Sequence, residues 1–220
     1  MFRDALTYPA RSDEETLLVG AILTFAVGVL TRLGVVTALA VAPVVLLAGY
    51  ALAVLRAGAA GADDPPEFGD ARTLAVDGAR TLAVVTGYLG GPAVALAVTL
   101  GGANAAGRPA TVGTTGVVLG AGTVVLLTVA GVAYLLPAAL VGVARRRTLR
   151  AAVDVGQLGR TAFAARYLVG WVSAVVVAGL AWALASALAT VGRVGEALGL
   201  AVTVYAVVAV ARLLGRSVGE

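Results

Sequence analysis

The sequence predicts an all-α integral membrane protein with about six transmembrane helices and amphipathic interfacial helices on the cytoplasmic side. The 220-residue chain is 60% hydrophobic and 13% charged, whereas soluble domains are about 45–50% apolar and about 25% charged. Its apolar residues gather in long runs, as they do in membrane spans. Thirteen of its sixteen arginines fall in alternate gaps between these runs, which orients the helices across the membrane. One membrane domain, residues 1–220, fits this length.

The first apolar run, from Leu17 to Leu55, is too long for a single span of about 20 residues. Arg32-Leu33-Gly34 interrupts it, so we expect a short first span over 17–33 and a second over 35–55. A re-entrant hairpin is the alternative for the first span. Either arrangement returns the chain to its starting side, so the later topology is the same.

The other spans are separated by turns that contain glycine or proline. We place them at 81–101, 112–136, 167–190 and 197–214, with Gly192 to Glu196 as the turn before the last. Pro43, Pro92 and Pro137 lie in or near spans and predict kinks, which membrane helices tolerate. Small residues throughout the spans predict close packing of the helices.

The arginines indicate which side of the membrane each loop faces. Thirteen of them lie in the N-terminus, the loops 56–80 and 137–166, and the C-terminus. The opposite side has only Arg32, Arg108 and Arg193. The positive-inside rule therefore predicts a cell-membrane protein with both termini and both long loops in the cytoplasm.

Each long loop contains an amphipathic stretch. At about 100° per residue, Asp77 and Arg80 share one face of residues 70–82, and Leu74 lies on the other. Residues 146–162 have a similar polar stripe that includes Asp154. We expect both stretches to lie flat at the cytoplasmic interface. Their spacing predicts two ion pairs, Asp77 with Arg80 and Arg150 with Asp154.

The most distinctive segment is the acidic turn, residues 61–70. Its four carboxylates, Asp63, Asp64, Glu67 and Asp70, would suit a divalent cation or a basic protein partner. Their spacing matches no EF-hand loop, so we favour a solvated turn that leads into a helix capped by Asp70. We therefore assign no metal site.

The composition excludes several kinds of chemistry. The chain has no cysteine, histidine or lysine, which removes thiolate chemistry and the commonest general bases and metal ligands. Within the predicted span limits there is no Asp, Glu, His or Lys, which argues against a proton-coupled transporter and an intramembrane metalloprotease. Hydroxyl groups such as those of Thr128 and Ser173 are expected to bond to carbonyls of their own helices. We assign no catalytic residue and no cofactor.

Several short stretches carry a resemblance to a known family. They are Gly49-Tyr50, Leu55-Arg56-Ala57, residues 61–68 and Val76-Asp77-Gly78, with a weaker likeness at Ala5-Leu6-Thr7-Tyr8-Pro9. Together they resemble an archaeal multi-pass membrane family common in halophiles, the domain of unknown function 4013. The resemblance implies a membrane location and an archaeal source. It brings no activity and no site residues.

Three classes of function fit these observations. The first is a non-enzymatic membrane component that acts through protein partners or by organising the bilayer. The second is a permease or lipid-handling protein for an uncharged or lipophilic substrate. The third is an enzyme at the cytoplasmic interface, which requires Asp77, Arg80, Asp154 and Arg160 to converge.

The expected partners are the lipid bilayer and a protein at the cytoplasmic loops. We expect no nucleic acid, because the arginines lie on one side of the membrane, where they determine the orientation of the helices. The oligomeric state is left open. The candidate interaction residues are Asp63, Asp64, Glu67, Asp70, Asp77, Arg80, Asp154 and Arg160.

Overall fold

A computed structural model describes residues 7–8, 14–32, 41–105 and 112–219 of the chain. The described residues form helices and connecting turns, without a β-strand. The elements are α2 (Glu14–Arg32), α3 (Val41–Ala59), α4 (Ala71–Ala105), α5 (Val112–Arg146), the 3-10 helix η3 (Leu149–Val153), α6 (Val155–Ala162), α7 (Ala165–Ala189) and α8 (Arg193–Gly219). The chain is thus an all-α membrane protein, as the sequence predicts.

Five helices in the described residues are long and apolar enough to cross a membrane. The candidate spans are Val41–Ala59, Ala71–Val98, Gly122–Arg146, Ala165–Ala189 and Arg193–Val218. In α2 the apolar part, Leu18–Gly28, is shorter. α2 ends at Arg32, and both the rest of the predicted break, Leu33-Gly34, and the expected start of the second span, at 35, lie outside the described residues.

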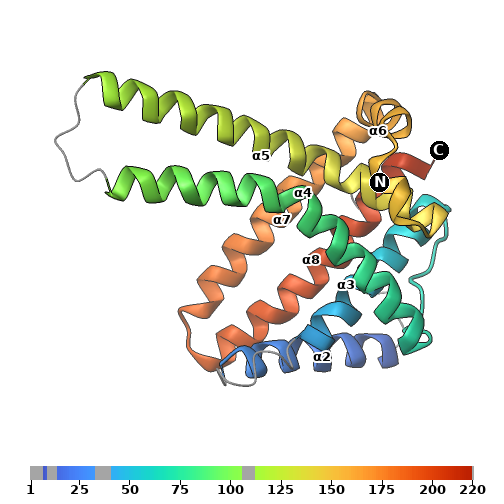
Figure 1. Cartoon of the computed structure of the whole chain (residues 1–220). Helices are drawn as coiled ribbons and strands as arrows, with labels where there is room; N and C mark the ends of the chain where they lie inside the picture. Colours follow the sequence, from blue (N-terminus) through green and yellow to red (C-terminus); the bar gives the residue numbers. More distant parts are fainter. Residues whose placement is uncertain (1–6, 9–13, 33–40, 106–111, 220) are drawn as a thin grey trace.

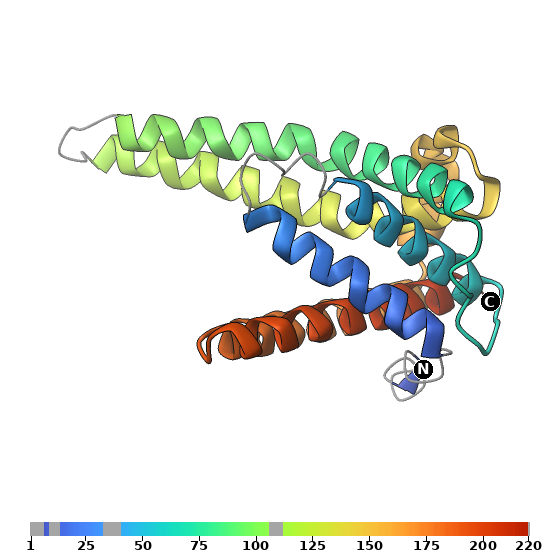
Figure 2. The same cartoon turned by 90° about the horizontal axis from the view of Figure 1, so that it is seen from below.

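The helices form two hairpins around α3. α7 packs along α8, α4 packs along α5 near their polar ends, and α3 lies against both α4 and α8. Figures 1 and 2 show that the α4–α5 and α7–α8 hairpins diverge from a shared end, with α2 crossing beside α3 and α8. Pro92 lies inside α4, which bends along its length in Figure 1. Proline removes a helix hydrogen bond and is a common cause of such bends.

Glycines allow α3 to approach both of its neighbours at backbone contact. A Cβ at Gly49 would overlap the Leu74 carbonyl of α4, and a Cβ at Gly78 would overlap the Val45 carbonyl of α3. On the other face of α3, Gly58 meets Gly215 of α8. Close approach of small residues is a main source of helix association in membranes.

The sequence has GxxxG motifs at Gly87–Gly91, Gly116–Gly120 and Gly195–Gly199, and the described glycines among them are not at these contacts of α3. Gly87, Gly91 and Gly120 have open space where a Cβ would lie. The pair Gly195 and Gly199 does face a neighbour, because both lie against carbonyls of α7. The spacing of glycines within one helix does not show which of them contact a second helix.

One predicted boundary is wrong in a way that matters for the site. Residues 71–80 were expected in a separate interfacial helix, but they form the first turns of α4, continuous with the span. Asp77 and Arg80 therefore lie in the same helix as the third predicted span, within the stretch Ala71–Val98 that is long and apolar enough to cross a membrane. Within this stretch Asp77 forms ion pairs with Arg56 and Arg80.

The other local predictions can be checked residue by residue. The turn before α8 comes slightly earlier than expected, at residues 190–192, where Gly192 adopts φ +87°. This is a left-handed conformation that glycine adopts without strain. Thr128 and Ser173 donate to the carbonyls of Val124 and Val169, four residues earlier in their own helices, as predicted.

Candidate functional site at the polar end of the bundle

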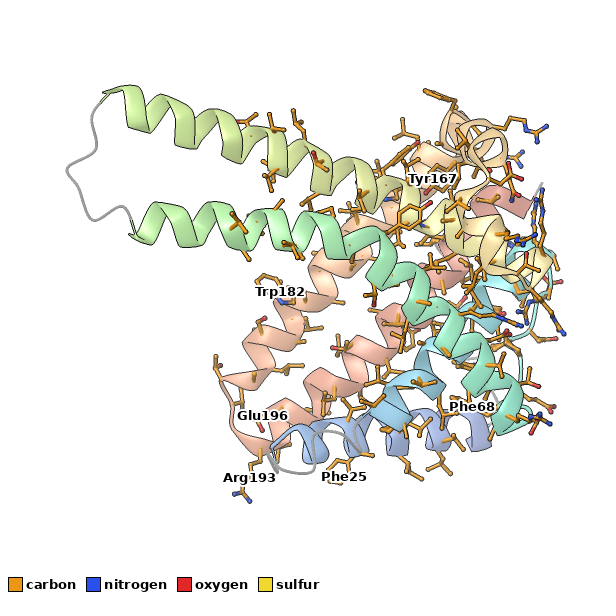
Figure 3. The ribbon with its side chains drawn as sticks, viewed as in Figure 1. Phe25, Phe68, Tyr167, Trp182, Arg193 and Glu196 are labelled. Atoms are coloured by element: carbon orange, nitrogen blue, oxygen red, sulfur yellow. The ribbon has the colours of Figure 1, made fainter. Side chains whose placement is uncertain are left out.

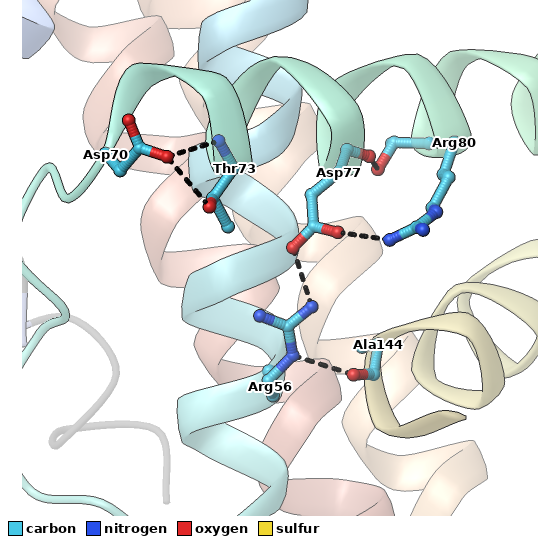
Figure 4. Close-up of polar contacts among 7 residues, drawn as sticks. Arg56, Asp70, Thr73, Asp77, Arg80 and Ala144 are labelled. Atoms are coloured by element: carbon cyan, nitrogen blue, oxygen red, sulfur yellow. Dashed lines mark hydrogen bonds and ion pairs between the residues drawn. The ribbon is translucent and has the colours of Figure 1, made fainter. Parts of the chain in front are cut away.

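Three polar clusters lie at the end of the bundle where the two hairpins meet. The first is the Asp77 cluster, shown in Figure 4. One carboxylate oxygen of Asp77 accepts from Arg56 Nη2 at 2.8 Å, and the other accepts from Arg80 Nη1 at 3.0 Å. The Asp77 side chain is only 5% exposed, while those of Arg56 and Arg80 are 26% and 31% exposed. The predicted pair between Asp77 and Arg80 is confirmed.

Arg56 also connects the cluster to a third helix. Its Nε donates to the Ala144 carbonyl at 2.7 Å, near the C-terminal end of α5 (Figure 4). The last four carbonyls of a helix have no partner within that helix, so a cationic donor there is favourable. Arg56 on α3 thereby ties α4 to α5 through two charge-assisted contacts.

The second cluster attaches the acidic turn to α8. Asp63 lies 3.4 Å from Arg216 and 4.0 Å from Arg212, and Arg212 Nη1 donates to the Ala62 carbonyl. The Arg212 side chain is fully buried, and its guanidinium lies 4.1 Å from the centre of the Tyr8 ring, a cation–π arrangement. Tyr8 in turn donates to the Asp64 carbonyl at 2.9 Å. The turn is held by contacts from two distant parts of the chain.

The far end of the acidic turn is also anchored. Phe68 stacks on Tyr50 of α3 with ring centroids 4.2 Å apart. Asp70 accepts from the backbone N–H groups of Arg72 and Thr73, which confirms it as the predicted helix cap. These two backbone hydrogen bonds are the main reason that the pKa of Asp70 is lowered. In the part of the chain that the structure describes, no three carboxylates come together as a metal site.

The third cluster joins α5 to α6. Asp154 accepts from the Gln157 backbone N–H at 3.1 Å as the cap of α6, and from Arg146 at 2.8 Å. The predicted pair with Arg150 does not form. Arg147 at φ +53° ends α5, and residues between it and Asp154 form η3, so positions 150 and 154 do not share an α-helix.

The Asp154 contacts have a defined pH dependence. The hydrogen bond from Gln157 and then the contact with Arg146 lower the pKa of Asp154 below its ordinary value of 3.8. A carboxylate with a lowered folded-state pKa contributes stability above its unfolded value, and the contribution is lost as the pH falls through the folded-state pKa. Cap and ion pair are thus both fully formed at neutral pH.

We expect Asp154→Ala to loosen α6 and Asp154→Asn to have a much smaller effect. Alanine removes both the cap and the ion pair, whereas asparagine is as good an N-cap as aspartate and loses only an exposed ion pair. Amide hydrogen exchange at pH 7 over Val155–Ala162 measures the difference, and alanine should speed exchange severalfold. Equal exchange in the two variants would show that the cap does not hold this helix.

Aromatic side chains attach η3, α6 and α7 to the neighbouring helices. Tyr88 donates to the Ala152 carbonyl and Tyr134 to the Ala162 carbonyl, each at 2.5 Å. Tyr167 donates to the Tyr134 carbonyl, and Trp171 to the Ala133 carbonyl. Amphipathic aromatic residues are enriched at membrane interfaces, and this signal was available in the sequence.

The eight candidate residues do not form one site. Asp77 and Arg80 share the first cluster, Asp154 belongs to the third, and Arg160 donates to Gly156 within α6. Asp63, Asp64, Glu67 and Asp70 all lie on the acidic turn. Sequence reasoning missed the contacts of Arg56, Arg212 and Arg216, whose partners are far away along the chain, and that of Arg146 with Asp154, which lies eight positions away.

An apolar cleft of about 330 Å³ lies below the Asp77 cluster, between the two hairpins. Side chains of α3, α5, α7 and α8 line it, and Thr81 of α4 is the lining residue closest in sequence to Asp77 and Arg80. Trp182 projects from α7 toward the space between the hairpins (Figure 3). The indole is 75% exposed. A second apolar cavity of about 400 Å³ lies between α2, α3 and α8 under the Tyr50–Phe68 stack.

Comparison with known proteins places the chain in one family. No curated protein and no solved structure matches it. A family model described as "Protein of unknown function (DUF4013)" matches residues 32–190, which is more than half of the chain. These residues include α3, α4, α5, α6 and α7, and with them the Asp77 cluster, the acidic turn and most of the cleft wall. The protein belongs to the DUF4013 family.

Proposed function

We propose that the protein is a non-enzymatic membrane component that binds a lipophilic molecule, and specifically a lipid acyl chain, in the cleft between its two hairpins. The observation that carries this proposal is the cleft itself. Its volume, about 330 Å³, falls within the usual range for ligand sites, and leucine, valine and alanine side chains form most of its wall. A cavity of this chemistry inside membrane-spanning helices suits a hydrocarbon chain far better than a polar solute.

The divergence of the hairpins supports access from the bilayer. The walls of the cleft include exposed residues such as Ala178 and Trp182 of α7, so the cleft is not sealed by the bundle. Lipid can therefore enter sideways between α4–α5 and α7–α8. A polar permease is less well supported, because among the described lining residues only Thr81 and Thr203 have a hydroxyl group.

An enzyme at the cytoplasmic interface has weaker support. Both oxygens of Asp77 are bound by arginines, and Asp154 is bound by Arg146 and by the N-terminus of α6. Carboxylates held in this way are stabilised as anions and are poor general bases near neutral pH. Asp77 and Asp154 also belong to different clusters.

We expect Ala178→Trp to displace bound lipid from the cleft. Ala178 lines the cleft and is exposed, so an indole there fills the cavity without entering the core. Native mass spectrometry of tagged protein, gently extracted from its own membrane, should show a severalfold loss of retained lipid. The matched control is Ala183→Trp, at an exposed position of α7 outside the cleft. Equal lipid retention in both variants would contradict the proposal.

A protein partner at the acidic turn is the second candidate. The turn presents exposed Asp63, Asp64 and Glu67 and is held at both ends by Arg212, Arg216 and the Tyr50–Phe68 stack. A charged surface that is already ordered loses less entropy when it binds. The same mass spectra would reveal a partner as a stoichiometric protein adduct that is lost in a variant with Asp64→Asn and Glu67→Gln.

We further propose one membrane domain of six spans, with the polar end in the cytoplasm of the cell. The three polar clusters and the arginine-rich ends of α5 and α8 lie together, and Arg193 lies at the opposite end of α8 (Figure 3). We expect cysteines placed at exposed Ala60 and Val191 to be labelled from opposite sides of intact cells, with Val191 outside. The chain has no native cysteine, so labelling reports these sites alone. The reverse pattern would overturn the orientation.

A further inference from the structure

A third cavity, of different chemistry, lies at the junction of α5, α6, α7 and α8. It has a volume of about 420 Å³ and is lined by Arg145 and Arg146 of α5, Gln157 and Arg160 of α6, and Arg166 of α7. We call it the arginine pocket. None of its lining residues is a carboxylate, whereas the cleft between the hairpins contains no charged side chain.

The arginines of the arginine pocket differ in their partners. Arg146 is paired with Asp154 at 2.8 Å. Arg145 donates to the Val218 carbonyl at 3.0 Å and Arg160 to the Gly156 carbonyl at 3.2 Å, and a backbone carbonyl carries no net charge. A guanidinium has five N–H donors, so each of these two arginines keeps donors for a further acceptor. Four guanidiniums around one cavity suit an anion with several acceptor oxygens, such as phosphate.

Gln157 adds a polar atom to the pocket. Its Oε1 is buried and has no hydrogen-bond partner in the described part of the chain. A buried acceptor without a donor costs free energy. The arginines of the pocket, rather than this oxygen, therefore determine the kind of ligand, an anion such as a phosphate ester.

The surroundings indicate where this phosphate comes from. Phe163, at the end of α6, is 93% exposed, and Val155, at its start, is 80% exposed. A short amphipathic helix that exposes large apolar side chains beside arginines is typical of the membrane interface. Basic pockets between helices on the cytoplasmic side of a membrane are suited to anionic lipid headgroups.

We infer that the arginine pocket binds the phosphate of an anionic lipid headgroup at the membrane interface. The ligand is a phosphate ester whose negative charge lies among Arg145, Arg146, Arg160 and Arg166. Apolar side chains of α6 enter the bilayer next to it. The inference uses residues other than those of the apolar cleft, so it stands or falls independently of the proposed function.

Titration of the purified full-length protein in neutral detergent tests this inference, with thermal unfolding and native mass spectrometry as readouts. The probes are phosphatidylglycerol, phosphatidylcholine and inorganic phosphate. We expect phosphatidylglycerol to bind and raise the unfolding temperature, with inorganic phosphate competing weakly. The double variant R145Q/R160Q should bind phosphatidylglycerol at least about tenfold more weakly, because each basic residue contributes to headgroup attraction.

The control variant R72Q/R193Q loses the same charge at exposed positions outside the pocket and should bind like the unchanged protein. The variant R145K/R160K keeps the charge and should retain most of the binding, which separates loss of the site from loss of the fold. Strong binding of inorganic phosphate without preference for phosphatidylglycerol would keep the phosphate site but assign it to a free phosphate. Equal binding of both lipids, or equal loss in the control, would overturn the inference.

Discussion

Replacing Gly78 with alanine is expected to destabilise the helix bundle more than any other single methyl addition at a described glycine of α4. The new Cβ would overlap the Val45 carbonyl oxygen of α3, and at the same contact Gly49 meets the Leu74 carbonyl. Both obstacles are backbone atoms, so no side chain can rotate away to make room. Overpacking costs about 1–3 kcal/mol, and backbone contact places Gly78 at the upper end. The unfolding midpoint in detergent should fall by roughly 5–10 °C.

The matched control is Gly87→Ala, in the same helix. A Cβ at Gly87 would have open space around it. Alanine favours the helical state over glycine by about 1 kcal/mol, so this variant should be as stable as the unchanged protein or slightly more stable. Similar midpoints for the two variants would show that α3 and α4 do not meet at these glycines.

The contrast between Gly78 and Gly87 shows what the sequence can predict about this fold. Hydropathy and arginine distribution predict the helices and their order, because both depend on local composition. The contacts between helices depend on residues such as Gly49 and Gly78, which are far apart in the chain and belong to no shared motif. The GxxxG at Gly87 and Gly91 is a motif without a contact. Only the three-dimensional arrangement distinguishes these cases.

The contacts of the candidate site likewise include some that the sequence predicts and some that it does not. The contact between Asp77 and Arg80 follows from helical spacing, and the cap at Asp70 follows from its position before an apolar helix. The contact of Asp77 with Arg56 spans 21 positions, and that of Arg216 with Asp63 spans 153. Such partners have no local signal. The predicted pair of Arg150 with Asp154 was wrong because its helical spacing assumed a continuous helix.

Asp77→Asn is expected to cost about 2 kcal/mol of stability, although it changes a single atom type. Removing one partner of a buried ion pair usually costs about 3–5 kcal/mol, because the other charge remains buried. Here the two arginines left behind are 26% and 31% exposed, so water screens part of their charge and reduces the cost. Asparagine keeps the shape of the side chain but loses the charge and replaces one of the two acceptor oxygens with a donor, so the loss measures the charge-assisted contacts. The readout is again the unfolding midpoint in detergent.

Asp70→Asn is the control, since it makes the same substitution seven positions earlier, at an exposed helix cap where asparagine serves equally well. Its midpoint should stay within about 1 °C of the unchanged protein, since exposed substitutions of this kind have small effects.

The comparison between Asp77→Asn and Asp70→Asn also bears on function. If Asp77→Asn were as harmless as Asp70→Asn, the Asp77 carboxylate would not be needed to hold Arg56 and Arg80 in the bundle. A carboxylate in a membrane helix without a structural role is a functional group by default, and the interfacial enzyme would then be the better hypothesis.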